Sequence, residues 1–141
     1  MKCKIRQIYI ILLLVVVITF VLLYAYKKVK EDKVILLKSE SFFDEFDVKE
    51  DKVYIKCYLT IQNSSSNDKY INLSANLKGD AINGLLKSPI VSGVNKKGSD
   101  KFFIKANSTK GYNVIFVGEY AGKPQKLTRS LPPIEIKVIN N

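Results

Sequence analysis

The stretch Lys52–Gln62, KVYIKCYLTIQ, decides the fold that this sequence predicts. Successive side chains of a β-strand point to opposite faces of a sheet, so a half-buried strand shows apolar residues at every second position. This stretch meets that pattern at all five inward positions, which are Val53, Ile55, Cys57, Leu59 and Ile61. The pattern predicts a β-strand with one face in a hydrophobic core.

Further apolar or alternating runs predict strands at 34–39, 70–80, 101–106, 112–120 and 127–140, with one or two short strands between 81 and 100. Residues 107–111 are expected to form a turn, and the acidic segment 41–51 a loop or a short helix. About seven strands at this spacing, with no soluble helix, predict an all-β fold, an immunoglobulin-like antiparallel β-sandwich. A small barrel is the alternative.

One stretch, FFIKANSTKGYNVIFVG at residues 102–118, resembles the late strand–turn–strand of fibronectin-III-like and related bacterial immunoglobulin-like domains. In those domains a tyrosine opens the second strand and alternating apolar residues follow it. Tyr112 would take that position here. The resemblance implies a β-sandwich that works by binding, and it carries no catalytic residues with it.

Residues 8–26, IYIILLLVVVITFVLLYAY, contain no charge, glycine or proline, and Thr19 is their one weakly polar residue. A helix of this length spans roughly 28 Å, close to the about 30 Å of a bilayer's hydrocarbon core. The run exceeds an ordinary secretory signal, and no small-residue cleavage site follows it. We expect a basic tail at 1–7, a transmembrane helix at 8–26, a charged linker at 27–33 and a β-sandwich domain at 34–141.

Basic residues flank the predicted transmembrane helix on both sides and would lie near lipid headgroups. They are Lys2, Lys4 and Arg6 before it and Lys27, Lys28 and Lys30 after it. The positive-inside rule does not separate such similar flanks. A short basic tail before a first helix usually stays in the cytoplasm. We therefore expect a single-pass protein of the cell membrane with an extracytoplasmic domain.

The net charge of +10 does not indicate nucleic-acid binding. About half of it flanks the apolar run, and only Arg6 and Arg129 carry the guanidinium group that base and phosphate recognition favours. Abundant Lys, Ile and Asn are typical of a low-GC bacterium. Cys3 and Cys57 would lie on opposite sides of the membrane, so no intramolecular disulfide is expected.

The sequence has no His, which removes the common nucleophilic triads and most zinc sites, and we predict no cofactor. An acidic cluster in segment 41–51 offers oxygen ligands for Ca²⁺ through Asp44, Glu45 and Asp47. Its spacing is not that of an EF-hand. A solvated surface is the simpler interpretation, because charge runs usually need no ligand.

Tyr54 and Tyr58 share the outward face of the predicted strand 52–62, with Lys56 between them. Tyrosines on a sheet surface can anchor a partner, unless other parts of the chain cover them. We expect a membrane-anchored module that binds a protein or another envelope component and is not an enzyme. The sequence leaves two alternatives open: a small membrane-bound enzyme using Lys and Ser or carboxylates, and a scaffold on the cytoplasmic side.

Overall fold

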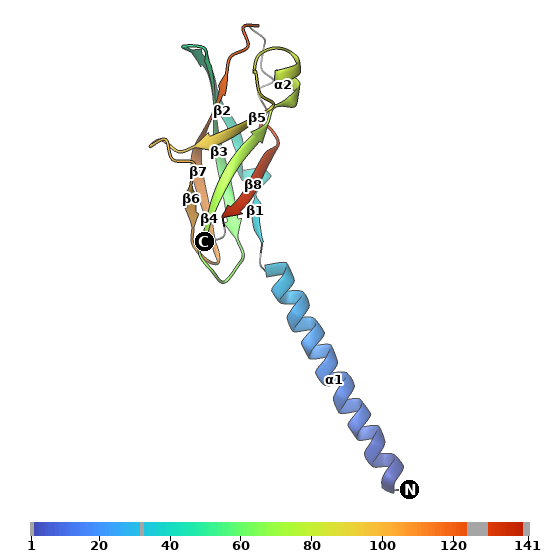
Figure 1. The fold of residues 1–141 in the computed structure, drawn as a ribbon. Helices are drawn as coiled ribbons and strands as arrows, with labels where there is room; N and C mark the ends of the chain where they lie inside the picture. The colour runs from blue at the N-terminus through green and yellow to red at the C-terminus, as the bar shows by residue number, and fades with distance from the viewer. Residues whose placement is uncertain (1, 32, 124–129, 140–141) are drawn as a thin grey trace. The chain divides into compact units, whose positions relative to one another are not determined.

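The computed structural model describes residues 2–31, 33–123 and 130–139 (Figure 1). The chain divides into two compact units, residues 1–33 and residues 34–141. The first unit is the helix α1 (Lys2–Glu31). The second contains the strands β1 (Val34–Leu36), β2 (Phe42–Lys49), β3 (Lys52–Asn63), β4 (Lys69–Asn76), β5 (Ile90–Val94), β6 (Phe102–Ile104), β7 (Ser108–Glu119) and β8 (Ile134–Ile139), a 3₁₀ turn η1 (Lys38–Glu40) and a short helix α2 (Lys78–Ile82).

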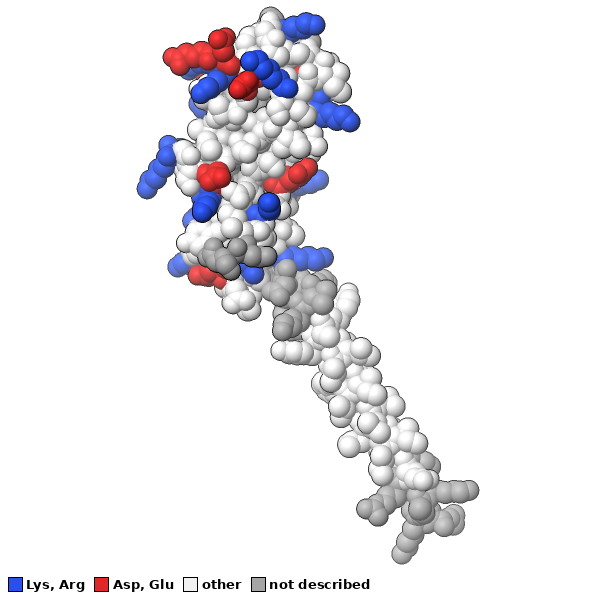
Figure 2. Space-filling model, in the orientation of Figure 1, with Lys and Arg blue, Asp and Glu red and all other residues white. Residues whose placement is uncertain are grey.

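Helix α1 contains the segment Tyr9–Tyr26, which has a mean hydropathy of 2.7 and is long and apolar enough to cross a membrane. Its described side chains are exposed along the whole segment and carry no charge (Figure 2). The hydroxyl of Thr19 donates to the carbonyl oxygen of Val15 at 2.8 Å. The helix therefore satisfies this polar group internally, as a hydrocarbon surrounding requires. The helix also continues to Glu31, through most of the predicted linker 27–33.

The strands of the second unit form one antiparallel sheet that curls upon itself, and the prediction of a mostly β, antiparallel domain is confirmed (Figure 1). β3 lies between β7 on one side and β1 and β2 on the other. β4 pairs with β5, β6 and β8. β5 joins the two halves, because it pairs with both β4 and β7. At this junction Gly93 pairs with Phe116, and a Cβ on Gly93 would overlap the side chains of Val114 and Phe116.

The core lies between the inward faces of β3, β4 and β7. All five apolar positions that the sequence predicts as inward on β3 are at most 2% exposed. The inward residues of the other strands join the same cluster: Ile71, Leu73, Ala75 and Leu77 from β4 and its end, and Val114 and Phe116 from β7. The alternation in these segments was therefore a correct indication of which side chains enter the core.

The prediction of a loop or short helix at 41–51 is wrong, because residues 42–49 form β2, which pairs with β3. The register shifts between Phe43 and Glu45, so that Asp44 is an extra residue in this strand. A β-bulge of this kind turns the following residues to the other face. Phe43 and Phe46 consequently both pack against the core although they are three residues apart. The sequence of β2 therefore does not show apolar residues at every second position, although the strand is continuous.

Two further expectations differ from the structure. The turn predicted at 107–111 is shorter, because β7 begins at Ser108 and includes Gly111. The change of direction occurs at Asn107, which has a φ of 47°. The short helix α2 was not expected, and it follows β4 directly. The N-terminal part of the last predicted segment, 127–129, lies outside the described residues, whereas 134–139 form β8.

Candidate binding surface

The predicted surface residues Tyr54, Lys56 and Tyr58 lie together on the outer face of β3, where each is half-buried. The strands β2 and β7 flank them in register. Across these strands Tyr54 pairs with Asp47 and Val117, Lys56 pairs with Glu45 and Ile115, and Tyr58 pairs with Phe42 and Asn113. We call these nine residues, together with Gly111, the tyrosine face.

An aromatic pair forms one end of the tyrosine face. The rings of Phe42 and Tyr58 stack with their centroids 5.3 Å apart and an angle of 21° between their planes. Phe42 is 54% exposed, so the stack is open to solvent on one side. Tyr58 also lies over Gly111, where a Cβ would overlap its ring and hydroxyl group. The glycine thus provides the space that keeps this tyrosine flat against the sheet.

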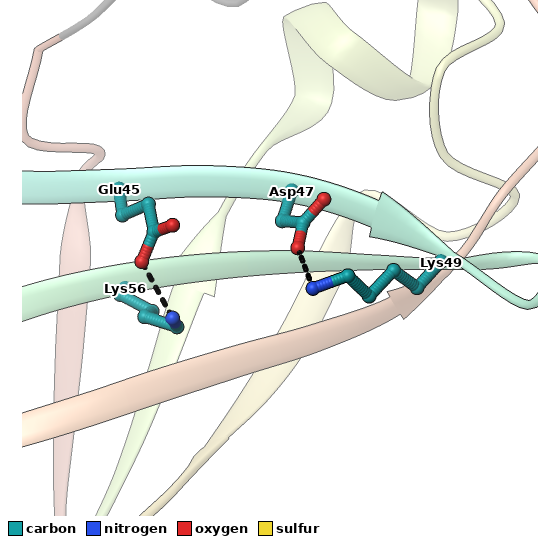
Figure 3. Close-up of polar contacts among 4 residues, drawn as sticks. All are labelled: Glu45, Asp47, Lys49 and Lys56. Carbon is teal, nitrogen blue, oxygen red and sulfur yellow. Dashed lines mark hydrogen bonds and ion pairs between the residues drawn. The ribbon is translucent and has the colours of Figure 1, made fainter.

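Two ion pairs on β2 and β3 involve residues of the tyrosine face (Figure 3). Lys56 donates to Glu45 across the two strands at 2.5 Å, and Lys49 contacts Asp47 on the same strand at 2.5 Å. The hydrogen bond from Lys49 is the main reason that the pKa of Asp47 lies below its ordinary value of 3.8. Such exposed pairs add little to stability, but they fix the pattern of charge that a partner would meet.

A depression of about 330 Å³ is lined in part by the ion pair of Glu45 and Lys56. Its polar lining includes Asp44, Lys96 and Asn113, and Ile115 supplies an apolar wall. Cys57 borders it from the core side, and burial raises the pKa of its thiol to about 12. The thiol is therefore protonated at neutral pH and is a poor nucleophile. The depression presents charges of both signs, from Asp44 and Glu45 on one hand and Lys56 and Lys96 on the other.

The acidic residues considered for Ca²⁺ do not converge in the structure. Asp44 occupies the bulge, while Glu45 and Asp47 are engaged by lysines. Among the residues that the structure describes, no three His, Cys, Asp or Glu side chains are grouped as a metal site. The basic flanks Lys2, Lys4, Arg6, Lys27, Lys28 and Lys30 belong to α1, but their side chains lie outside the described part of the chain.

Sequence reasoning found the three β3 residues of the tyrosine face and missed its neighbours. Phe42 was missed because the bulge at Asp44 hides the strand that carries it. Ile115 and Val117 lie in the predicted strand 112–120, but their position beside Lys56 and Tyr54 follows only from the pairing of β3 with β7. Comparison of the chain with protein-family models, curated protein sequences and solved structures gives no match.

Proposed function

We propose that this chain is a single-pass membrane protein whose extracytoplasmic β domain binds a protein or another envelope component through the tyrosine face. The anchor is the segment Tyr9–Tyr26, which has the length, the apolar composition and the internally bonded backbone that a bilayer requires. A soluble helix would instead show a polar stripe on one side. The short basic tail before the helix supports a cytoplasmic N-terminus and a domain on the opposite side of the membrane.

We also propose that the curled sheet is an immunoglobulin-like sandwich. Two features support this assignment. Tyr112 donates a hydrogen bond of 2.6 Å from its hydroxyl to the carbonyl oxygen of Phe103, nine residues earlier. Immunoglobulin-like sandwiches contain a comparable tyrosine that bonds to upstream backbone. In addition, the inward faces of β3 and β4 contribute to the same core cluster, as opposed layers do.

The single observation that carries the binding role is the composition of the tyrosine face. Two half-buried tyrosines alternate with Lys56 on one strand, and Ile115 and Val117 extend the apolar surface onto the next strand. Aromatic residues with adjacent apolar area are enriched where proteins bind one another, and a rim of charges supplies selectivity. The ion pair of Lys56 with Glu45 provides such charges here.

Photocrosslinking in intact cells tests the binding role. A photoreactive amino acid in place of Tyr58 should yield one dominant adduct, whereas the same group in place of Glu135, on the outer side of β8, should not. The adduct should decline when Tyr54 is changed to Ala. The double variant Lys56→Glu and Glu45→Lys exchanges the two charges but keeps an ion pair. This exchange should also lower the yield of the adduct. Equal labelling from both positions would contradict the proposal.

The proposed orientation has its own test. Protease added to intact cells should degrade the domain while a cytoplasmic control protein survives. A domain that persists until the cells are lysed would lie in the cytoplasm. This result would overturn the orientation and leave the membrane anchor in place.

A further inference from the structure

We propose that the domain itself makes a second membrane contact, in which the aromatic pair of Tyr70 and Phe103 and the lysines around it bind anionic phospholipid headgroups. This inference rests on the proposed membrane anchor, because it concerns the end of the domain to which that anchor is joined. It concerns the β4–β6 side of the domain and does not involve the tyrosine face.

Tyr70 and Phe103 are cross-strand partners on β4 and β6. Their ring centroids lie 5.2 Å apart with an angle of 50° between the planes. The neighbouring residues Ile71, Phe102 and Ile104 are buried in the core, so the aromatic pair points to the opposite, outer face. Tyr70 remains 42% exposed. The sheet therefore displays two adjoining aromatic rings on its surface.

This aromatic pair lies at the end of the domain that is attached to the helix. Val34, the first residue of the domain, pairs with Asn63, and Asn63 pairs with Ser108. The loop after Asn63 leads directly into β4, and Tyr70 is the second residue of that strand. Residues 27–33, which separate the domain from the predicted membrane span, reach at most about 25 Å even when fully extended. A membrane anchor would thus keep this end of the domain close to the bilayer surface.

The charges around the aromatic pair are mainly positive. Four lysines lie beside β6 or pair with or bond to these two strands: Lys101, Lys105, Lys110 and Lys137. The Nζ atom of Lys110 is 3.5 Å from the carbonyl oxygen of Phe103 and 5.1 Å from the ring centroid of Tyr112. The carboxylates in this region are Asp68, Asp100 and Glu135, and Asp68 already accepts a hydrogen bond from the backbone of Ala106. In this region the lysines outnumber the carboxylates.

Tyrosine and lysine together are the residues that settle at a membrane–water interface. The aromatic ring lies at the headgroup level, and the ammonium groups are attracted to anionic lipid. Each lysine contributes a modest attraction that depends on the negative charge of the surface. The contact should therefore require anionic lipid, whereas insertion of an apolar helix should not.

The chain provides a clean optical test because it contains no Trp. The full-length protein is reconstituted into vesicles whose lipids are brominated near the headgroup end of their acyl chains, and Tyr70→Trp supplies the fluorophore. The matched control is Ile90→Trp. Ile90 is 54% exposed and pairs with Asn76 at the other end of β4, about 20 Å away. A third variant, Phe20→Trp, reports whether the helix is inserted.

In vesicles containing phosphatidylglycerol, the emission of Tyr70→Trp should be quenched at least about two-fold more than that of Ile90→Trp. The difference should vanish in pure phosphatidylcholine, and it should shrink when Lys101 and Lys105 are changed to Gln. Phe20→Trp should be quenched in both lipids. If Phe20→Trp is quenched and Tyr70→Trp matches Ile90→Trp, the headgroup contact is refuted and the anchor stands. If Phe20→Trp is not quenched, the anchor is refuted and this contact with it.

Discussion

The side-chain amide of Asn63 donates a hydrogen bond of 3.0 Å to the carbonyl oxygen of Lys105, although 42 residues separate the two in the chain. The same amide donates to the carbonyl oxygen of Asn67 at 2.9 Å, and its oxygen accepts from the backbone and the hydroxyl of Ser65 at 3.0 and 2.7 Å. Asn63 is completely buried. One side chain therefore holds the β3–β4 loop against the turn between β6 and β7.

Replacing this asparagine should be costly. We expect Asn63→Ala to lower the free energy of unfolding by about 2–4 kcal/mol, because several buried polar groups lose their partner at once. The control is Asn72→Ala, which removes one exposed hydrogen bond to Asp100 and should cost at most about 1 kcal/mol. Urea denaturation of the detergent-solubilised protein, followed by the near-ultraviolet circular dichroism of its tyrosines, measures both. If both variants lose the same free energy of unfolding, the buried hydrogen bonds of Asn63 do not stabilise the domain as proposed.

The pairing of β5 with β7 should tolerate no side chain at position 93. A methyl group on Gly93 would overlap the side chains of Val114 and Phe116, which are fully buried. We expect Gly93→Ala to reduce the free energy of unfolding by about 1–3 kcal/mol. Gly79→Ala is the matched control, because no atom lies within 4 Å of its Cβ position, and it should change stability by less than about 1 kcal/mol. The same urea titration compares them.

The hydroxyl of Tyr112 makes domain stability sensitive to alkaline pH. Burial raises its pKa to about 12 from the ordinary value of 10.0. The folded state thus holds this proton more tightly than the unfolded state, and its contribution is complete below pH 10 and is lost as the pH rises towards 12. Tyr112→Phe removes the hydrogen bond to Phe103 and should cost about 1 kcal/mol at neutral pH.

The test for Tyr112 compares the free energy of unfolding of the wild type with that of Tyr112→Phe. The comparison is needed because lysines also titrate at high pH. We expect this difference in the free energy of unfolding to shrink between pH 10 and 12. Tyr70→Phe serves as the control, since Tyr70 is a more exposed tyrosine on another strand. A difference that stays constant over this range would contradict the assignment of the raised pKa to Tyr112.

Cys57 should be inert in the folded protein. Its thiol is buried and its raised pKa of about 12 leaves very little thiolate at pH 8. In a Cys3→Ser background, we expect a maleimide to label Cys57 at least about 1000-fold more slowly in the native state than in urea. Intact-mass measurement follows the reaction. Rapid native labelling would show that the core around β3 opens far more readily than its burial implies.

Much of the fold follows from local patterns in the sequence. Wherever a strand is regular and has one face in the core, apolar residues fall at every second position, as in Lys52–Gln62. The apolar helix is equally evident from the sequence, because residues 8–26 form one uninterrupted run without a charge, glycine or proline. The candidate surface was visible only in part, because Tyr54, Lys56 and Tyr58 lie on such a regular strand.

The sequence by itself determined that residues 8–26 form an apolar helix, that residues 52–62 form a strand with a known inward face, and that residues 112–120 form a strand. These properties depend on residues that are near one another in the chain. The tertiary structure alone decided that β2 is a bulged strand, that Phe42 stacks on Tyr58, and that Asn63 bonds to Lys105. Each of these depends on strand pairing, which brings together residues whose separation leaves no periodic trace in the sequence.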